Sequence, residues 1–400
     1  MPSTKYLRCL IYPLKNAFTS SSNIPLVTFI SKLCLYPRQF PLFPNKSGTF
    51  IPSRPGWRTK FFKYFAQLGI LLHLLGCLNW FKIQWFDHKQ CGVVTPTWKF
   101  MLVTCSMIIF AAESLSFPHI DQVKMHLVTL LNSAMSVEIK LQRGVFNNAG
   151  NLGRYVTTYF VLMGACITWG VGFILPAVFI LSLLQPCMPP LISAFAFVPC
   201  TSWTDDGAAT GFLIKAAVGI YEMYMWSVLI GISAFVFMIM ILYPVEVNLL
   251  LLKDMERNWR NFVQLRTLQM LSNLQNFVFA APSMGVIIGT LTLLESCAIY
   301  ILMKSGELIP LPIFVLLSIA AIDYLIVILG IFKIGSNPYV KSMRFIQLTK
   351  TNKLSKYEVA FIKSCPPSKL SLGDGRFFDR LTSFVIWQKC IDWIITFLLM

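Results

Sequence analysis

Seven stretches of the chain are apolar over roughly the length that a helix needs to cross a bilayer, about 20 residues. They cover residues 61–81, 100–117, 155–184, 212–243, 283–303, 311–332 and 381–400. The third and fourth are longer than the hydrocarbon core is thick, so we expect them to tilt or to extend beyond it. The pattern predicts an all-α, multi-pass membrane bundle with seven transmembrane helices.

The composition agrees with this prediction. Hydrophobic residues make up 56% of the chain and charged residues 13%, whereas soluble domains carry about 25% charged residues. The 33 Phe and 10 Trp are too many for a disordered or collagen-like chain. An ordinary soluble fold is therefore excluded, and the formal net charge of +17 has to be explained by where the basic residues lie.

The basic residues gather on one side of the predicted membrane. Segments 1–60, 118–154, 244–281 and 334–380 hold 26 of the 34 Lys and Arg, and the alternate connections hold at most four. Because positively charged connections resist translocation, we expect the N-terminus in the cytoplasm and the C-terminus outside. A G-protein-coupled receptor has the opposite orientation. The same asymmetry explains the net charge without a nucleic-acid partner.

The spans divide the chain into four regions. Residues 1–60 contain no Asp or Glu and are expected to form a basic cytoplasmic tail on anionic lipid, with a transit peptide as the alternative. Residues 61–333 form a six-helix bundle, within which 244–281 is an amphipathic cytoplasmic extension of the fourth helix. Residues 334–380 form a basic anchor loop, with a helix at 355–363, before the last helix at 381–400.

Segment 125–141 is apolar only in patches and carries His126, Asn132, Glu138 and Lys140. We interpret it as an amphipathic helix at the membrane surface, and an eighth span is the alternative.

Three of the 11 cysteines are expected on the outer side, where an oxidising environment allows disulfides. They are Cys91, Cys187 and Cys200. A bond between Cys187 and Cys200, within one connection, is the preferred pairing, and three free thiols are the alternative. Neither the cysteines nor the four histidines show a metal-binding spacing, and no nucleotide-binding or nucleophile motif occurs. We expect no metal, no cofactor and no enzyme.

Charged residues inside the predicted spans are costly in hydrocarbon and usually face a bundle interior or water. Pairing is one interpretation: Glu222 with Lys215 on one helix face, and Asp392 with Lys389. A functional role is the other. The residues concerned are Glu113, Lys215, Glu222, Glu295, Asp323, Lys389 and Asp392.

One stripe of the last span changes from polar to apolar toward its outer end. Its members follow helical spacing: Gln388, Asp392, Ile395 and Leu399. Such a stripe suits a water pathway that closes at a hydrophobic constriction, and an interhelical contact is the alternative.

Aromatic residues gather in the outer halves of the third and fourth spans. Together with a few polar groups they suit a site for a small apolar ligand, although aromatic residues also serve in lipid contact and packing. The candidate ligand-binding residues are Trp169, Phe179, Tyr221, Tyr224 and Glu295.

The chain ends in Asp392-Trp393, five residues and Leu399-Met400. This ending is similar in length and register to the terminal Thr-Tyr, five apolar residues and Gln-Phe of the arthropod gustatory and odorant receptor superfamily. Trp393 stands where that family has Tyr, and Ser364-Cys365 resembles its short Cys-containing stretch before the last span. Seven spans, a cytoplasmic N-terminus and an extended fourth helix extend the resemblance over about residues 60–400.

The resemblance implies a tetrameric ligand-gated cation channel whose last span lines a central pore and whose cytoplasmic helices join the subunits. We therefore expect a gustatory-receptor-like, non-selective cation channel in the plasma membrane, a homo- or hetero-tetramer in contact with membrane lipid. A small-molecule ligand bound in the outer half of the bundle would open it.

A secondary transporter or proton-coupled carrier that uses Glu222, Glu295 and Asp323 is the alternative function. The absence of an internal sequence repeat counts against it. A membrane adaptor whose basic cytoplasmic surface is the functional part is a third hypothesis.

Overall fold

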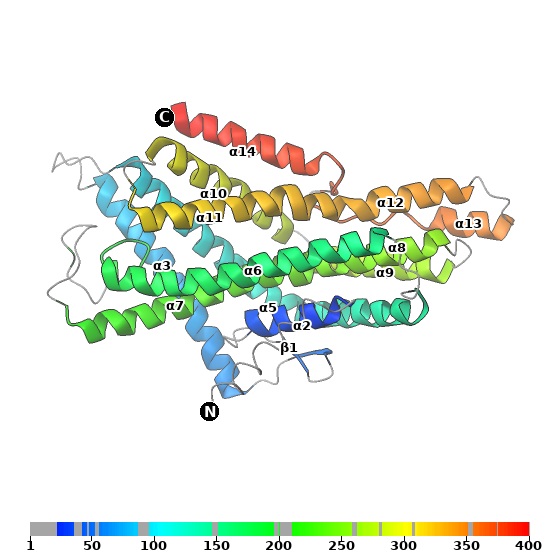
Figure 1. Ribbon diagram of the computed structural model, residues 1–400, viewed down its shortest axis with the longest axis horizontal. Coiled ribbons are helices and arrows are strands. Elements are labelled where there is room, and N and C mark those ends of the chain that lie inside the picture. The colour runs from blue at the N-terminus through cyan, green and yellow to red at the C-terminus, as the bar shows by residue number, and fades with distance from the viewer. Residues whose placement is uncertain are drawn as a thin grey trace.

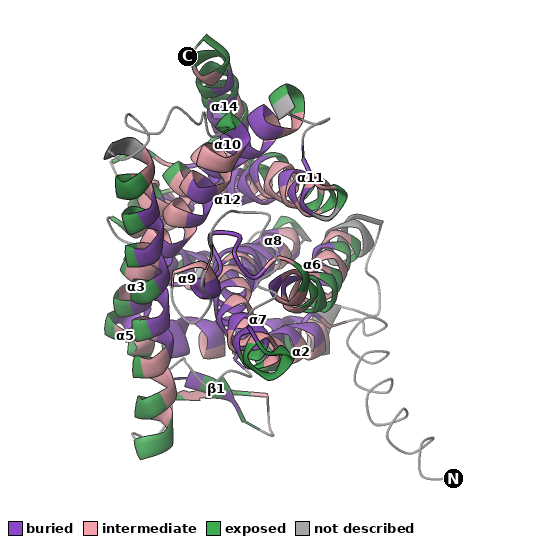
Figure 2. Ribbon diagram, turned by 90° about the vertical axis from the view of Figure 1, so that its left-hand side faces the viewer, coloured by how far each residue is buried: buried purple, intermediate pink, exposed green. Residues whose placement is uncertain are grey.

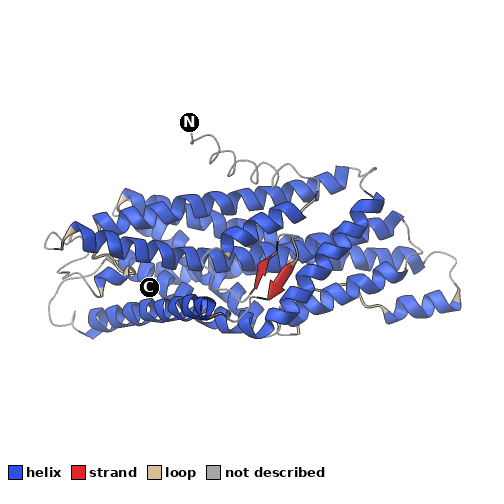
Figure 3. Cartoon of the chain, turned by 90° about the horizontal axis from the view of Figure 1, so that it is seen from below, coloured by secondary structure: helices blue, strands red, loops and turns tan. Residues whose placement is uncertain are grey.

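The computed structural model describes residues 22–35, 42–45, 48–52, 56–86, 96–145, 151–195, 200, 210–257, 262–279, 282–305, 309–350, 355–373 and 375–399. These residues form an elongated bundle whose long helices run roughly along its longest axis (Figure 1). Apart from an isolated bridge, the only strands in this part of the chain form one short hairpin (Figure 3).

Within the described residues, seven helical stretches are long and apolar enough to cross a membrane. Each contains one predicted span, so the prediction of an all-α polytopic bundle is confirmed. The stretches belong to α3 (Trp57–Phe86), α5 (Thr97–Val145), α6 (Asn151–Leu184), a continuous rod of α7 (Phe212–Ala234), η3 (Phe235–Leu242) and α8 (Tyr243–Arg257), α10 (Ser283–Ser305), a second rod of α11 (Leu311–Ile326), η4 (Val327–Ile331) and α12 (Phe332–Lys350), and α14 (Thr382–Leu399).

The rod of α7, η3 and α8 forms the centre of the bundle. Every residue from 238 to 249 is buried, and a helix that is apolar on all sides is typical of a buried core. Viewed along the long axis, buried residues gather around this rod, and exposed residues cover the outward faces of α3, α6 and α14 (Figure 2).

The outward faces of α3 and α6 carry large apolar side chains. A soluble monomer rarely exposes a continuous apolar patch of this kind, and each such side chain would cost free energy in water. Hydrocarbon is the environment in which these two faces are stable. The exposed residues are Leu68, Leu71, Leu72, Leu75 and Leu78 on α3, and Leu162, Trp169, Phe173 and Ile180 on α6.

Helix α5 is a single helix of 49 residues. At 1.5 Å per residue it is about 73 Å long, so much of it extends beyond a hydrocarbon core of about 30 Å. Segment 125–141 is the C-terminal part of this helix and not a separate surface helix. The prediction of a separate helix over 125–141 is wrong, because α5 continues through Pro118 without a break.

We call the end of the bundle that holds α8, α9 (Phe262–Val278), α12 and α13 (Lys356–Ser364) the basic end, and the opposite end, with the α6–α7 connection, the loop end (Figure 1). At the basic end the extension of the fourth helix is not one helix over 244–281. Helix α8 ends at Arg257, and α9 packs against it. Residues 258–261 lie outside the described residues.

Segment 334–380 begins as a helix and not as a loop, because α12 continues the sixth span to Lys350 with Pro338 inside it. The helix predicted at 355–363 is α13. Its N-terminus is fixed by a capping box in which Ser355 Oγ accepts from the backbone N–H of Glu358 and the Glu358 carboxylate accepts from that of Ser355. The chain between α13 and α14 then leads back along the bundle.

Part of the predicted N-terminal tail is folded onto the bundle. Helix α2 (Ile24–Cys34) packs against α6, α7 and η3, and strands β1 (Leu42–Pro44) and β2 (Phe50–Pro52) pair antiparallel. Gly231 permits the close contact with α2, because a Cβ there would lie 2.8 Å from the Cys34 carbonyl oxygen. Residues 1–21 of the tail lie outside the described residues.

Two polar side chains of α5 hold this folded segment. Glu138 accepts from the backbone N–H of Asn23 at 2.7 Å and from Ser22 Oγ at 3.0 Å. The Asn132 amide bonds both the N–H and the carbonyl oxygen of Phe50, each at 2.8 Å. The C-terminal part of α5 is therefore the platform for the N-terminal segment.

Candidate functional site

A cavity of about 310 Å³ lies in the middle of the bundle, between α5, α6, α7, α10 and α11. On the central rod its lining runs from Trp226 to Phe237. It therefore begins about 21 Å along the rod from Phe212, at 1.5 Å per residue. The cavity is nearer to the middle of the helices than to the loop end. Its volume falls at the lower end of the range for small-molecule sites, about 300–1,000 Å³.

The wall of the cavity is apolar with a few polar groups. Aliphatic residues such as Ile109, Leu291 and Leu317 form most of it. None of the described residues that line it is a Lys, Arg or His. An apolar wall with a few polar groups is the usual construction of a small-molecule site. The polar lining residues other than cysteine are Ser106, Glu113, Ser116, Thr290, Ser233, Asp323 and Tyr324, with the indole of Trp226 beside them.

Glu113 is the most deeply buried carboxyl group of this wall. It lies on the buried face of α5 between Phe110 and Phe117 and is 7% exposed. One carboxyl oxygen, Oε1, accepts from Ser233 Oγ at 3.1 Å. The other, Oε2, has no hydrogen-bond partner among the described residues. One residue of the cavity wall thus carries a buried oxygen without a hydrogen-bond partner among the described residues, which is costly.

Two π-helical turns border the cavity on the side of the basic end. They are η3 in the fourth helical rod and η4 in the sixth, and they pack against each other. Val236 and Phe237 of η3 and Val327 and Ile331 of η4 line the cavity. Such turns occur often at functional sites because they shift the register of a helix locally.

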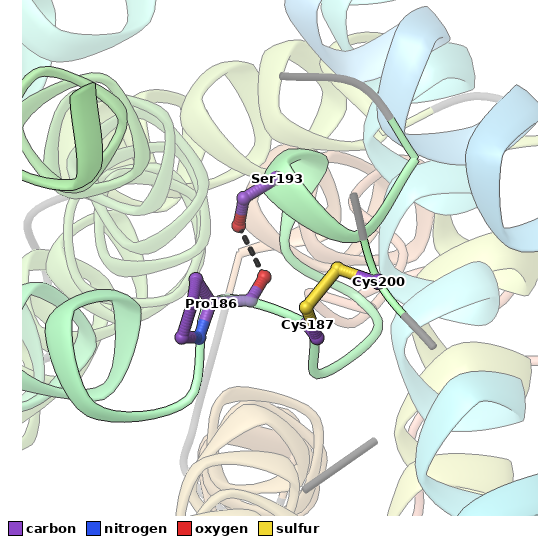
Figure 4. The surroundings of a disulfide bond; sticks show 4 residues. All are labelled: Pro186, Cys187, Ser193 and Cys200. Carbon is purple, nitrogen blue, oxygen red and sulfur yellow. Dashed lines mark hydrogen bonds between the residues drawn. A yellow bond between two sulfur atoms is a disulfide. The ribbon is translucent and has the colours of Figure 1, made fainter. Parts of the chain in front are cut away.

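The α6–α7 connection covers the bundle at the loop end. Residues 186–193 are all buried. Cys187 and Cys200 are joined by a disulfide bond, and Ser193 Oγ donates to the Pro186 carbonyl oxygen at 2.6 Å (Figure 4). This is the cysteine pair that the sequence favoured. Cys91 lies outside the described residues.

The connection reaches into two parts of the bundle. Met188 packs in a cluster with Trp98, near the start of α5, and with Ile309, which precedes α11. The short 3₁₀ helix η2 (Ile192–Ala194) contacts α3 and α7. We call the described part of this connection, residues 186–195 and Cys200, the closure.

A fully partnered carboxylate, Glu222 of α7, anchors the closure. Its Oε1 accepts from the backbone N–H of Ile192 at 2.5 Å, and its two oxygens lie 3.2 and 3.3 Å from His73 Nε2 of α3. His73 Nδ1 lies 2.7 Å from the Gly69 carbonyl oxygen, which can only accept, so Nδ1 carries a proton. Both side chains are fully buried.

The sequence-based pairing of Glu222 with Lys215 is not what the structure shows. Glu222 bonds across helices to His73, 149 residues away in sequence, and to the closure. The pairing of Asp392 with Lys389 is present, with Lys389 Nζ 3.2 Å from Asp392 Oδ2.

None of the five ligand-binding residues predicted from sequence lines this cavity. Trp169 is 65% exposed and stacks on Phe173, with ring centroids 5.4 Å apart. Phe179 packs on Gly219 of α7. Tyr221 and Tyr224 each pack against Phe65 of α3.

Glu295 is 1% exposed on α10 and is also not part of the lining. A ligand role for these five residues stays a prediction, and the cavity draws on other faces of the same helices.

The predicted stripe of α14 lies on one exposed face of the single chain. Gln388, Asp392, Ile395 and Leu399 are all exposed, and Leu399 is 84% exposed. The opposite face packs on α10, where Ser296 Oγ donates to the Cys390 carbonyl oxygen at 3.2 Å. The buried residues of that face are Thr382, Ser383, Ile386, Cys390 and Ile394.

Two lining residues carry a signal in the sequence, because Glu113 and Asp323 are charges within spans. Trp226 carries only the weaker signal of an aromatic residue in the fourth span. Their meeting at one cavity depends on how α5, α7 and α11 pack, which spacing along one helix does not specify. The described residues contain no group of three or more His, Cys, Asp or Glu that could hold a metal ion.

No protein-family model matches the chain, and no curated protein matches it in sequence. Among solved structures, the chain is similar to the insect olfactory receptor OR5 from Machilis hrabei in complex with eugenol. The TM-score is 0.60 at 11% sequence identity, over 92% of this chain and 97% of the receptor. A second structure of the same receptor gives a TM-score of 0.56 at 10% identity, covering 93% and 96% of the two chains.

This likeness shows the fold. The chain is a multi-pass membrane protein with the seven-helix fold of an insect olfactory receptor. The seven-helix fold expected from the resemblance to this receptor superfamily is therefore confirmed.

Proposed function

We propose that the protein is a chemosensory receptor of the insect odorant and gustatory superfamily that acts as a ligand-gated, non-selective cation channel. The observation that carries the proposal is the cavity of about 310 Å³ in the middle of the bundle. It occurs in a fold shared, over almost its whole length, with a receptor whose structure was determined in complex with the small molecule eugenol.

A small-molecule ligand would occupy the cavity and be held mainly by apolar contact. The wall is shared by α5, α6, the central rod, α10 and the rod of α11 and η4, so a ligand there contacts most of the bundle at once. A ligand changes the population of open channels only if it binds one arrangement of these helices more tightly than another. The π turns η3 and η4 are the elements of the wall best suited to adopt two arrangements.

The exposed stripe of α14 is the proposed pore lining. Asp392 would attract cations, and Ile395 and Leu399 would form the hydrophobic constriction. The pore would form where the last helices of several subunits meet, in a homo- or hetero-tetramer, as the resemblance implies. The exposure of the stripe in the single chain supports this arrangement.

The proposed location is the plasma membrane, with the N-terminus in the cytoplasm and the C-terminus outside. The basic side chains near α8, α9, α12 and α13 support this orientation because such segments are retained in the cytoplasm. An N-terminal epitope that antibody reaches on intact cells would contradict it.

The cavity can be tested by filling it. Ala320 of α11 lines the cavity, and Ala320→Phe would place a phenyl ring inside it. We expect currents evoked by small apolar molecules to need at least about tenfold more ligand, the loss of about 1.4 kcal/mol of binding free energy. Whole-cell recording from cells that express the full chain, with a panel of odorants and tastants, measures this.

Ala217→Phe is the matched control, because Ala217 is exposed on α7 outside the cavity. Its currents should resemble those of the original chain. If Ala320→Phe reaches the cell surface and responds like Ala217→Phe, the cavity is not the ligand site. If no ligand in a broad panel evokes a current from the original chain at the surface, the channel proposal fails.

The pore can be tested separately at Asp392. Asp392→Asn removes a charge from the exposed stripe without changing its shape, so the relative permeability to divalent and monovalent cations should change by about two- to tenfold, in proportion to the lost attraction. Reversal potentials under bi-ionic conditions measure this. The sensitivity to ligand should stay unchanged, and an unaltered permeability would remove Asp392 from the ion pathway.

A further inference from the structure

The unpartnered oxygen of Glu113 is the most specific chemical feature of the cavity. The side chain is 7% exposed, Oε1 is bonded to Ser233, and Oε2 has no partner among the described residues. A buried carboxyl oxygen that no protein group satisfies is unfavourable. A ligand that brings a hydrogen-bond donor to Oε2 would remove this cost.

The charge of the wall narrows the chemistry of that ligand. Two carboxyl groups, Glu113 and Asp323, line the cavity, and no Lys, Arg or His is among its described lining residues. An acidic ligand would meet like charge and no counter-ion, so it is disfavoured. A positively charged ligand would find its counter-charge in the carboxyl groups of Glu113 and Asp323.

The second carboxyl group lies beside α6. A Cβ on Gly170 of α6 would stand 4.0 Å from Asp323 Oδ2, an ordinary van der Waals distance, and both residues line the cavity. Glycine at residue 170 thus places no side chain against this oxygen.

We propose that the cavity selects small apolar amines, with the Glu113 carboxyl group as the counter-ion of the bound ammonium. This inference rests on the proposed function of the cavity as a ligand site and adds the class of ligand. An amine satisfies Oε2 in either protonation state of the pair. If the carboxyl group is protonated, its proton passes to the amine nitrogen; if it is ionised, an ammonium N–H donates to it.

Other classes of ligand fit this site less well. A ketone or ester can only accept, so it matches Oε2 only when that oxygen is protonated, and an alcohol donates without charge. The aromatic residues Trp226 and Tyr324 also line the cavity, and aromatic rings attract cations. The aliphatic remainder of the wall takes the hydrocarbon part of the amine.

Matched pairs of probes test the proposal on the full chain. Phenethylamine and phenethyl alcohol differ only in the group that would meet Glu113, and hexylamine and hexanol, and cyclohexylmethylamine and cyclohexylmethanol, repeat the comparison on other hydrocarbon bodies. Thermal unfolding of the purified protein in detergent, measured over a range of each probe, gives apparent dissociation constants. This readout does not depend on channel activity.

In the original chain, we expect each amine that fits the cavity to bind at least about tenfold more tightly than its alcohol, or about 1.4 kcal/mol. Glu113→Gln keeps the shape and removes the charge, so it should abolish this preference and leave the alcohol unaffected. Glu246→Gln is the matched control, because Glu246 is also buried with one unpartnered oxygen but lies in α8, outside the cavity lining.

The comparison in the original chain needs no variant, so it holds even if Glu113→Gln does not fold. Equal binding of amines and alcohols, no binding of any amine in the set, or a preference that survives in Glu113→Gln would overturn the proposal. Currents recorded with the same probes separate it from the proposed function. Amine binding without currents supports the ligand class and contradicts the channel, whereas currents evoked only by the alcohols contradict the ligand class alone.

Discussion

Two carboxyl groups, Glu222 of α7 beside the closure and Glu113 of α5 in the cavity wall, are both buried within the helical bundle but have very different surroundings. Glu222 is bonded to the Ile192 N–H and to His73. Among the described residues, Glu113 bonds only Ser233, through one oxygen. An unsatisfied buried polar group costs about 1–3 kcal/mol. The bonds of Glu222 therefore stabilise the fold, whereas Glu113 keeps an oxygen that a ligand can bond.

The elements around the two residues differ in the same way. The closure is held by a disulfide, by the buried residues 186–193 and by contacts with α3 and α7. The cavity is bordered by two π turns and retains empty volume. The loop end is closely packed, whereas the middle of the bundle is not. A ligand in the cavity would therefore change the helix packing in the middle and leave the loop end unchanged.

The largest expected effect breaks the closure. Glu222→Ala leaves His73 and the Ile192 N–H buried without their partner. We expect a loss of about 3–5 kcal/mol in the free energy of unfolding, the range for removing one partner of a buried pair. Thermal unfolding in detergent and the amount of protein at the cell surface measure it.

Glu256→Ala is the control for that change, because Glu256 is exposed on α8. It should stay within about 0.5 kcal/mol of the original chain. If both variants were equally stable, the network around Glu222 would not contribute to the fold.

Removing the disulfide is expected to have an intermediate effect. Cys187 and Cys200 are 13 residues apart in sequence, and closing a loop of that size contributes about 2–4 kcal/mol by restricting the unfolded chain. The double variant Cys187→Ser/Cys200→Ser should therefore unfold at a lower temperature. A reducing agent should lower the unfolding temperature of the original chain toward that of the variant, and an equal decrease in both would show that the reductant acts elsewhere.

The smallest expected effect is at Glu113 and sharpens the comparison. Glu113→Gln keeps a group that can accept from Ser233, and Oε2 has no partner to lose. We expect the free energy of unfolding to change by less than about 1 kcal/mol, because no bond to Oε2 is broken. Unfolding of Glu113→Gln and Glu222→Gln under the same conditions compares the two losses of free energy of unfolding. A decrease at Glu113 as large as that at Glu222 would show that Oε2 is satisfied in the folded protein.

The seven spans could be predicted from sequence because length and hydropathy alone determine whether a helix can cross hydrocarbon. The ends of the helices could not. Hydropathy reports where the membrane ends, whereas α5 and α12 continue past that point through Pro118 and Pro338. Helical pairs close in sequence, such as Lys389 and Asp392, were accessible for the same reason that the spans were: the spacing on one helix fixes them.

The candidate site was less accessible because it depends on contacts between helices. Tyr224 and Trp226 are two residues apart and therefore point about 200° apart around α7, at 100° per residue. Tyr224 packs on Phe65 of α3, and Trp226 lines the cavity. The aromatic character of the two residues does not reveal this difference. The sequence spacing does not identify His73 as the partner of Glu222, since the two residues lie on different helices.

The sixth helical rod has a mechanical consequence. It is helical without interruption from Leu311 to Lys350, about 60 Å at 1.5 Å per residue. Its first half borders the cavity, its second half reaches the basic end, and η4 lies between them and contacts α14 (Figure 1). In the proposed channel, η4 would act as a pivot. A small sideways displacement of the first half by a bound ligand would then rotate the second half without unfolding any helical turn in between.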